Sequence, residues 1–172
     1  MSPRTAAPLR TGTWNVLTDR TSAAFEVRNF GFNRVRGSIP VRGGSVQVDA
    51  RGVVTAVHAE LDLAALDTGT PRRDTDLRKP NLLDSAANPV LAFDATDVRS
   101  TAEGWSAHGE LRLRGTSCPL VLLVARPTDG GETLRVHATA TLDRAPLGIK
   151  APRVMIGRYV EIVLDAFLAP PA

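Results

Sequence analysis

Residues 105–114 have the sequence WSAHGELRLR, in which apolar and polar side chains alternate along the chain. The large apolar residues share one side of this run, and the charged residues share the other. Successive side chains of a β-strand point to opposite faces, so a period of two predicts a strand with one buried and one wet face. A surface helix would instead repeat its apolar residues every three or four positions.

The same alternation recurs along most of the chain, with Gly and Pro clusters between the runs. We expect strands at residues 23–30, 34–41, 44–48, 53–63, 90–98, 105–114, 120–126, 133–142 and 158–168. About nine strands with turn signals at short intervals are typical of a β-sandwich or a closed barrel. The exception is residues 72–83, where Asp74 can cap a short helix.

The composition suits one folded domain rich in strands. The chain has 172 residues, of which 43% are hydrophobic, and it shows no internal repeat or long linker. We expect one domain at residues 14–169, preceded by a flexible segment at residues 1–13. The net charge is only +3, and Arg alternates with Asp and Glu throughout. Nucleic-acid binding normally needs a basic stripe or face, so no nucleic-acid partner is expected.

The sequence also lacks membrane and export signals. No run approaches the roughly 18 apolar residues that a membrane-spanning helix needs. Residues 1–13 contain no apolar stretch of the length that a signal peptide requires. We therefore expect a soluble, cytoplasmic protein without stable membrane insertion. Cys118 is the single cysteine, so it cannot form an internal disulfide.

The titratable residues give little support for catalysis or metal binding. All three histidines, His58, His108 and His137, take the polar positions of their strands and are expected at the surface. Zinc needs three or four converging ligands, which this spacing does not supply. Arg73 and Asp74 could in principle do acid–base work. Arg more commonly ties loops together through its five donors, and we favour that structural interpretation. The chain is thus not expected to be an enzyme or to hold a metal or cofactor.

Short motifs dispersed along the chain provide a second kind of signal. They are Trp14 with Asp19, Phe25 to Arg28, Thr68-Gly69, Arg73-Asp74, Leu77-Arg78, Pro89 to Phe93, Gly109 to Pro119, Asp143-Arg144, Leu147 to Ile149 and Gly157 to Ile162. In this order and spacing the sequence resembles the YceI-like family. The resemblance implies a lipocalin-like antiparallel β-barrel with a short helical insertion, which binds long apolar molecules such as polyisoprenoids. Cys118 stands where the family usually has Arg.

The interior of such a barrel can be solid or hollow. Small residues on the apolar faces of the predicted strands leave volume, although a barrel of about eight strands can be filled by side chains alone. The resemblance favours a ligand cavity. The side chains expected to line it are Phe25, Val27, Phe30, Phe32, Val35, Leu61, Leu63, Phe93, Leu111, Leu113, Val136, Ala138 and Ile162. Those expected at its mouth, near a head group, are Arg28, Arg73 and Asp74.

The expected function is binding, sequestration or transport of a long-chain amphipathic lipid, a polyisoprenoid or an isoprenoid quinone. Two alternatives stay open. One is an enzyme or redox accessory that acts on a bound quinone, and the other is an interaction module with a solid core. Residues 120–125 are apolar on both faces, so the outer face needs a cover. Either the helical insertion covers it or the chain forms a homodimer, which we expect.

Overall fold

The computed structural model describes residues 9–29, 33–77, 85, 87, 89–113, 115–130, 132–143, 146 and 159–172. The elements in this part of the chain are β-strands, one short α-helix and one 3₁₀ turn. They are β1 (Gly12–Val16), β2 (Ser22–Asn29), β3 (Asn33–Ser38), β4 (Val41–Val48), β5 (Val54–Asp62), η1 (Leu63–Ala65), α1 (Pro71–Leu77), β6 (Val90–Ser100), β7 (Gly104–Leu113), β8 (Thr116–Ala125), β9 (Thr128–Gly130), β10 (Thr133–Asp143) and β11 (Tyr159–Ala169).

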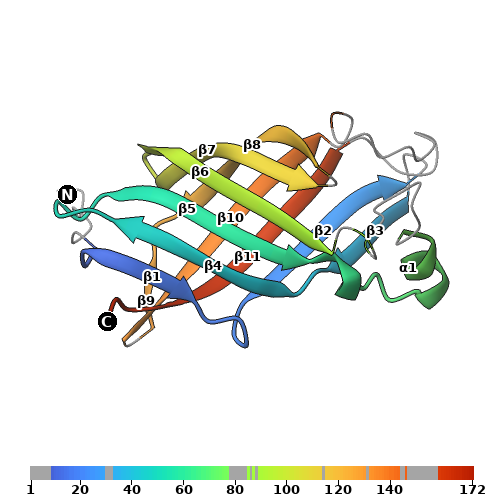
Figure 1. Cartoon of the computed structure of the whole chain (residues 1–172), viewed down its shortest axis with the longest axis horizontal. Helices are drawn as coiled ribbons and strands as arrows, with labels where there is room; N and C mark the ends of the chain where they lie inside the picture. Colours follow the sequence, from blue (N-terminus) through green and yellow to red (C-terminus); the bar gives the residue numbers. More distant parts are fainter. Residues whose placement is uncertain are drawn as a thin grey trace.

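Eight of these strands close into a barrel. β1, β4, β5, β6, β7, β8, β10 and β11 pair antiparallel in that order, and β11 pairs with β1 to complete the ring. β2 adds to β11 beyond the end of β1, and β3 pairs with β2. Figure 1 shows an elongated barrel with both chain ends at one end and α1 at the other. The predicted fold class, a single antiparallel barrel with a short helical insertion, is confirmed.

Alternation of side chains sets the inside and the outside of this barrel. Along β10, Val136, Ala138, Ala140 and Leu142 are buried, whereas the residues between them are more exposed. β10 pairs with β11 along its whole length, from Leu134 opposite Leu168 to Asp143 opposite Tyr159. Because each such register is fixed on both sides of a strand, the apolar faces of neighbouring strands meet in one interior.

Several predicted strand boundaries were wrong. The structure breaks the chain at Pro40, which has no backbone N–H to donate, so β3 ends at Ser38 and β4 begins at Val41. The turn before the strand expected at residues 120–126 lies at Gly115, whose φ of 72° suits glycine. β8 therefore begins earlier than predicted. The short strands β1 and β9 were not predicted, and β1 begins two residues inside the segment expected to be flexible.

A β-bulge also corrected one face assignment. The alternation in residues 53–63 placed Val53 on the inner face, but Val53 is 39% exposed and Val54 is buried. The register between β4 and β5 shifts between Gln47 and Val48, where Val48 pairs with Val54. One extra residue at a bulge reverses the side of the residues beyond it. From Val57 onward the predicted face holds.

The core divides into two clusters along the barrel axis. The larger cluster lies toward the α1 end and includes Leu63, Phe93, Leu111 and Leu142. Phe25 packs against it, with its ring over Gly37 in a space that any Cβ there would invade. The smaller cluster lies toward the chain ends and consists of Trp14, Val48, Val54, Val136 and Leu168.

The helix α1 begins with Pro71 at its first position, where the absent N–H costs nothing. The prediction placed a short helix within residues 72–83, capped by Asp74 and ending before Asn81, and residues 78–83 lie outside the described residues. The structure places Asp74 inside the first turn, and its carboxylate accepts hydrogen bonds from Thr68, which precedes the helix. Within the described residues, no helix has the length and apolar character needed to cross a membrane.

Asp74 and Arg73 fasten the helix to the turn before it. The Thr68 N–H donates to Asp74 Oδ1 at 2.9 Å, and the Thr68 hydroxyl donates to the same oxygen. Arg73 donates from Nε to Thr68 Oγ1 at 3.0 Å and from a terminal nitrogen to the Thr68 carbonyl at 3.1 Å. Thr68 is 8% exposed and Asp74 is 6% exposed, so these groups depend on each other for hydrogen bonds. This arrangement is structural.

We expect Asp74→Ala to destabilise the protein, because it leaves the buried Thr68 N–H and hydroxyl without their acceptor. The cost should be about 1–3 kcal/mol in the free energy of unfolding, measured by urea denaturation. The control is Asp97→Ala, which removes an exposed carboxylate paired with Arg99 and should change stability little. Equal effects of the two substitutions would contradict a structural role for Asp74.

Candidate functional site

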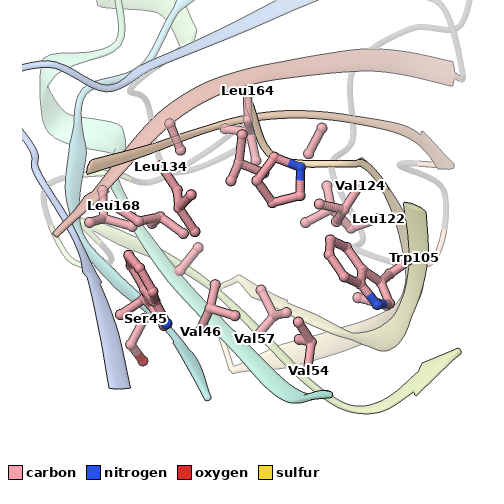
Figure 2. A pocket seen from close by; sticks show the side chains of 18 of the residues that line it. Ser45, Val46, Val54, Val57, Trp105, Leu122, Val124, Leu134, Leu164 and Leu168 are labelled. Atoms are coloured by element: carbon pink, nitrogen blue, oxygen red, sulfur yellow. The ribbon is translucent and has the colours of Figure 1, made fainter. Parts of the chain in front are cut away.

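The barrel contains an apolar cavity of about 90 Å³ near the end where the two chain ends lie. It is formed where β4, β6, β8 and β11 finish and where β5, β7 and β10 begin, together with β1 (Figure 2). The side chains that line it include Trp14, Val46, Val54, Val57, Trp105, Leu122, Val124, Leu134, Val136, Ala138, Leu164 and Leu168. In Figure 2, Val46 and Val57 face Leu134 and Leu164 across the space.

The walls of the cavity offer few polar groups. Besides the tryptophans, Ser45 and His58 are its polar lining residues, and they occupy the outward-facing positions of β4 and β5. The His58 side chain is engaged at the surface, where Nδ1 lies 2.6 Å from Asp94 and Nε2 lies 3.4 Å from Glu60. A cavity lined this way favours a hydrocarbon over water. Its recognition of a ligand therefore depends on shape and apolar contact.

Trp14 holds the segment that borders the cavity. Its ring is 6% exposed, and its Nε1–H donates to the Arg10 carbonyl at 2.9 Å. The Thr11 hydroxyl donates to the Asp49 carbonyl at 2.9 Å, which fastens the same segment to the turn after β4. Leu9 packs against the smaller cluster and lines the cavity. Leu9 thus forms part of the wall, and the hydrogen bonds of Arg10 and Thr11 hold it there.

Small residues create the space between the two clusters. Ala59, Ala107 and Ala138 line the cavity, and Ala107 is completely buried. Gly44, beside Ala59 on the neighbouring strand, leaves room for the side chain of Val16, which would lie 2.9 Å from a Cβ at that position. Toward the α1 end, larger side chains such as Phe93 pack in the larger cluster.

The residues predicted to bind ligand are divided between these regions. Val136 and Ala138 line the cavity. The remaining described residues of the predicted set are not among those that line the cavity: Leu63, Phe93, Leu111 and Leu113 lie within the larger cluster, Phe25, Leu61 and Ile162 pack against it, and Val27 and Val35 are paired on β2 and β3. Phe30, Phe32 and the side chain of Arg28 lie outside the described residues. Arg73 and Asp74 lie at the α1 end and bind Thr68.

Sequence reasoning missed most of the cavity wall. Trp14 was singled out only as part of a motif and as a core residue, and Leu134 and Leu168 were only covered by strand ranges. Trp105 and Val57 were placed correctly on inner faces, without any indication that they border empty space. Alternation could have identified all of these as interior residues. It could not show which part of the interior stays open.

The titratable groups of the described residues carry no sign of an active site. Burial raises the pKa of the Cys118 thiol, and the charges of Asp143 and Glu110 raise it further, so the nucleophilic thiolate is disfavoured. Hydrogen bonds, the largest from the Val53 N–H, lower the pKa of Asp49 in a surface turn. No group of three or more His, Cys, Asp or Glu side chains in this part of the chain could hold a metal ion.

Comparison with known proteins agrees with this geometry. The YceI-like domain model matches residues 14–168. A UPF0312 protein of Pseudomonas savastanoi pv. phaseolicola is 28% identical over 135 residues, which cover 74% of this chain and 70% of that protein. A UPF0312 protein of Yersinia pestis is 28% identical over 147 residues, covering 82% of this chain and 77% of that protein.

Solved structures share the fold at lower sequence identity. Burkholderia cenocepacia BcnA superposes with a TM-score of 0.75 at 13% identity, covering 88% of this chain and 98% of that one. A polyisoprenoid binding domain from Saccharophagus degradans, implicated in plant cell wall breakdown, has a TM-score of 0.66 at 15% identity, with coverage of 92% and 98%. These similarities establish the barrel architecture.

Ala138 and Ala140 provide a matched pair for testing the cavity. Both are buried on the inner face of β10 and belong to the larger cluster, but Ala138 lines the cavity and Ala140 does not. We expect Ala138→Phe to fill the space and abolish uptake of a fluorescent polyene lipid with little loss of stability. Ala140→Phe should overpack the core and cost about 1–3 kcal/mol in unfolding free energy.

Fluorescence of the bound polyene lipid measures uptake in both variants, and thermal denaturation measures their stability. If Ala138→Phe lowered stability as much as Ala140→Phe and left uptake unchanged, the space around Ala138 would be ordinary core.

Proposed function

Because the chain belongs to the YceI-like family, we propose that it binds a long-chain amphipathic lipid, a polyisoprenoid or an isoprenoid quinone, in the barrel interior. Its role is to sequester or transport that lipid. The observation that supports this most strongly is the apolar cavity inside a closed barrel, bordered by aliphatic side chains and two tryptophans. The related fold of the Saccharophagus degradans polyisoprenoid binding domain supports the same class of ligand.

Burial of the tail provides the binding energy. Each methylene moved from water to an apolar interior contributes about 0.8 kcal/mol, so a long tail binds well without a strong polar anchor. The cavity of about 90 Å³ is short for a tail of several isoprene units. A longer tail therefore displaces side chains, either at the Leu9 wall or at the boundary with the larger cluster. Valine, leucine and alanine side chains accommodate this by rotamer changes and small shifts.

The first alternative is an enzyme or redox accessory that acts on a bound quinone. It would use Arg28, Arg73 or Asp74 at the head group. Among these, Arg73 and Asp74 are engaged with Thr68 at the end of the barrel opposite the cavity. This geometry favours a carrier, which needs no cofactor of its own. A measured turnover of a quinone that disappears in Arg73→Ala without loss of fold would favour the enzyme.

The second alternative is an interaction module with a solid interior. The packed cluster at the α1 end is of this kind, but the space between Val46, Val57 and Leu164 is not. In a module of this type, affinity for a lipid would not depend on the length of its tail. Tail length is therefore the variable that separates the two functions.

We expect affinity to rise with tail length in a series of isoprenoid alcohols with two, three and four isoprene units. Displacement of a fluorescent polyene lipid measures it, and Ala138→Phe is the matched control. Binding should also show a negative heat-capacity change in calorimetry, which marks burial of apolar surface. Affinities that do not depend on tail length would exclude tail burial as the source of binding.

Native mass spectrometry of the purified protein, followed by organic extraction, identifies any lipid that copurifies. A bound molecule with an isoprenoid tail supports the proposal and gives the head group. A protein that takes up none of the isoprenoid alcohols and copurifies with no lipid would contradict it.

A further inference from the structure

An apolar strip crosses the outer surface of the barrel. It consists of Val121 and Leu123 on β8, Thr139 on β10, Val163 on β11 and Ala24 on β2, and we call these residues the outer strip. Leu123 pairs with Thr139, Thr139 with Val163, and Val163 with Ala24, so four strands present them side by side. Leu123 is 54% exposed, Val121 40% and Val163 37%, which are large values for aliphatic side chains.

The structure decides which face of β8 looks outward. Cys118, Leu120 and Leu122 are buried in the barrel, so the side chains between them point away from it. The described helix α1 does not cover this face, because it lies at the end of the barrel beside β3 (Figure 1). The outer strip therefore stays exposed although its sequence is apolar. Contiguous exposed apolar surface of this kind marks an interaction site.

The residues around the outer strip bear on what covers it. On the side nearer the chain ends, His137 Nδ1 lies 3.2 Å from Asp165, and Arg135 lies 3.8 Å from the same carboxylate. On the other side, Glu161 accepts hydrogen bonds from the Thr141 hydroxyl at 3.0 and 3.1 Å. Carboxylates thus border the strip on both sides. With Arg135 beside Asp165, the border of the strip carries both signs of charge, which suits a protein surface with matching groups better than a uniformly anionic bilayer.

The shape of the outer strip is complementary to itself. The large, exposed side chain of Leu123 stands at the β8 edge, and the small Ala24 stands at the β2 edge, with Thr139 and Val163 between them. A two-fold axis parallel to the strands and between β10 and β11 brings each Leu123 over the partner's Ala24. It also brings Thr139 over Val163. The barrel surface curves away on both sides of this axis, and a long side chain facing a short one fills the gap that the curvature leaves.

The same axis matches the polar groups. It sets His137 of one copy opposite Asp165 of the other, because these two residues face each other across β10 and β11. It sets Thr141 opposite Glu161 for the same reason. No two like charges of these four residues are then brought face to face. A symmetric interface needs this kind of self-complementary patch.

We propose that the outer strip is the interface of a homodimer, in which Leu123 of each chain packs against Ala24 of the other. The proposal is independent of lipid binding, since the outer strip and the cavity are on opposite faces of β8, β10 and β11. Sedimentation and light scattering at micromolar concentrations should give the mass of two 18.3 kDa chains.

Leu123→Arg should raise the dissociation constant of the dimer at least about tenfold. The melting temperature of the fold should stay unchanged. The control is Val53→Arg, which charges another exposed aliphatic residue away from the outer strip and should leave the dimer intact. Both variants should take up lipid as the unmodified protein does. Lipid uptake therefore reports on the cavity and the mass reports on the interface.

An exchange of side chains tests the arrangement itself. Leu123→Ala and Ala24→Leu should each weaken the dimer, the first by removing contact and the second by a clash with the partner's Leu123. The double variant restores one large and one small residue at each contact and should recover most of the affinity. If the dimer affinity of the double variant were no higher than the sum of the two single losses predicts, the two-fold arrangement would be rejected.

Two further outcomes would overturn the proposal. The first is a monomer for the unmodified protein at micromolar concentration. The second is Leu123-dependent flotation with phosphatidylglycerol vesicles, which would assign the outer strip to a membrane surface.

Discussion

The closed ring of eight antiparallel strands is the constraint on which the other features depend. Each strand of the ring has its backbone groups paired on two sides, so its register cannot slip without breaking two ladders of hydrogen bonds. A slip of one residue would also turn every inward side chain outward. β10 illustrates this, since its pairing with β11 and β8 fixes Ala138 inside and Thr139 outside. The cavity and the outer strip therefore lie on opposite faces of the same strands, and one strand register fixes both.

The interior is divided by the sizes of its side chains. Toward the α1 end, Phe93 and Leu111 belong to the larger cluster and Phe25 packs against it, and Gly37 provides the room that the Phe25 ring needs. Toward the chain ends, alanines and valines form the walls, and the space between them stays open. A barrel of this size stands at the limit between a filled core and a ligand cavity. This chain has larger side chains in one part of the barrel and an open apolar cavity in the other, where a tail can lie.

Polar chemistry is kept on the outside of this barrel. The described histidines interact with Asp94, Ser106 and Asp165 on the outer faces of their strands. Asp74 and Arg73 secure the helix, and the lowered pKa of Asp97 has its largest cause in the hydrogen bond from Arg99. These interactions stabilise turns and strand edges. The cavity walls formed by the described residues are mainly apolar, which suits the binding of an apolar molecule.

The sequence by itself determined most of the strands and their inner faces, because alternation with a period of two is a local property. Alternation left a sandwich and a barrel open, and the resemblance to the YceI-like family indicated the barrel. The sequence also indicated that residues 120–125 are apolar on both faces. It could not place the bulge that makes Val54, and not Val53, the inward residue. It also could not show that β1 closes the ring beside β11. The position of the cavity and the choice of Leu123 over Leu122 as the outward residue came only from the tertiary structure. Open volume and exposure depend on which side chains meet across the barrel, and that is fixed by strand register and closure.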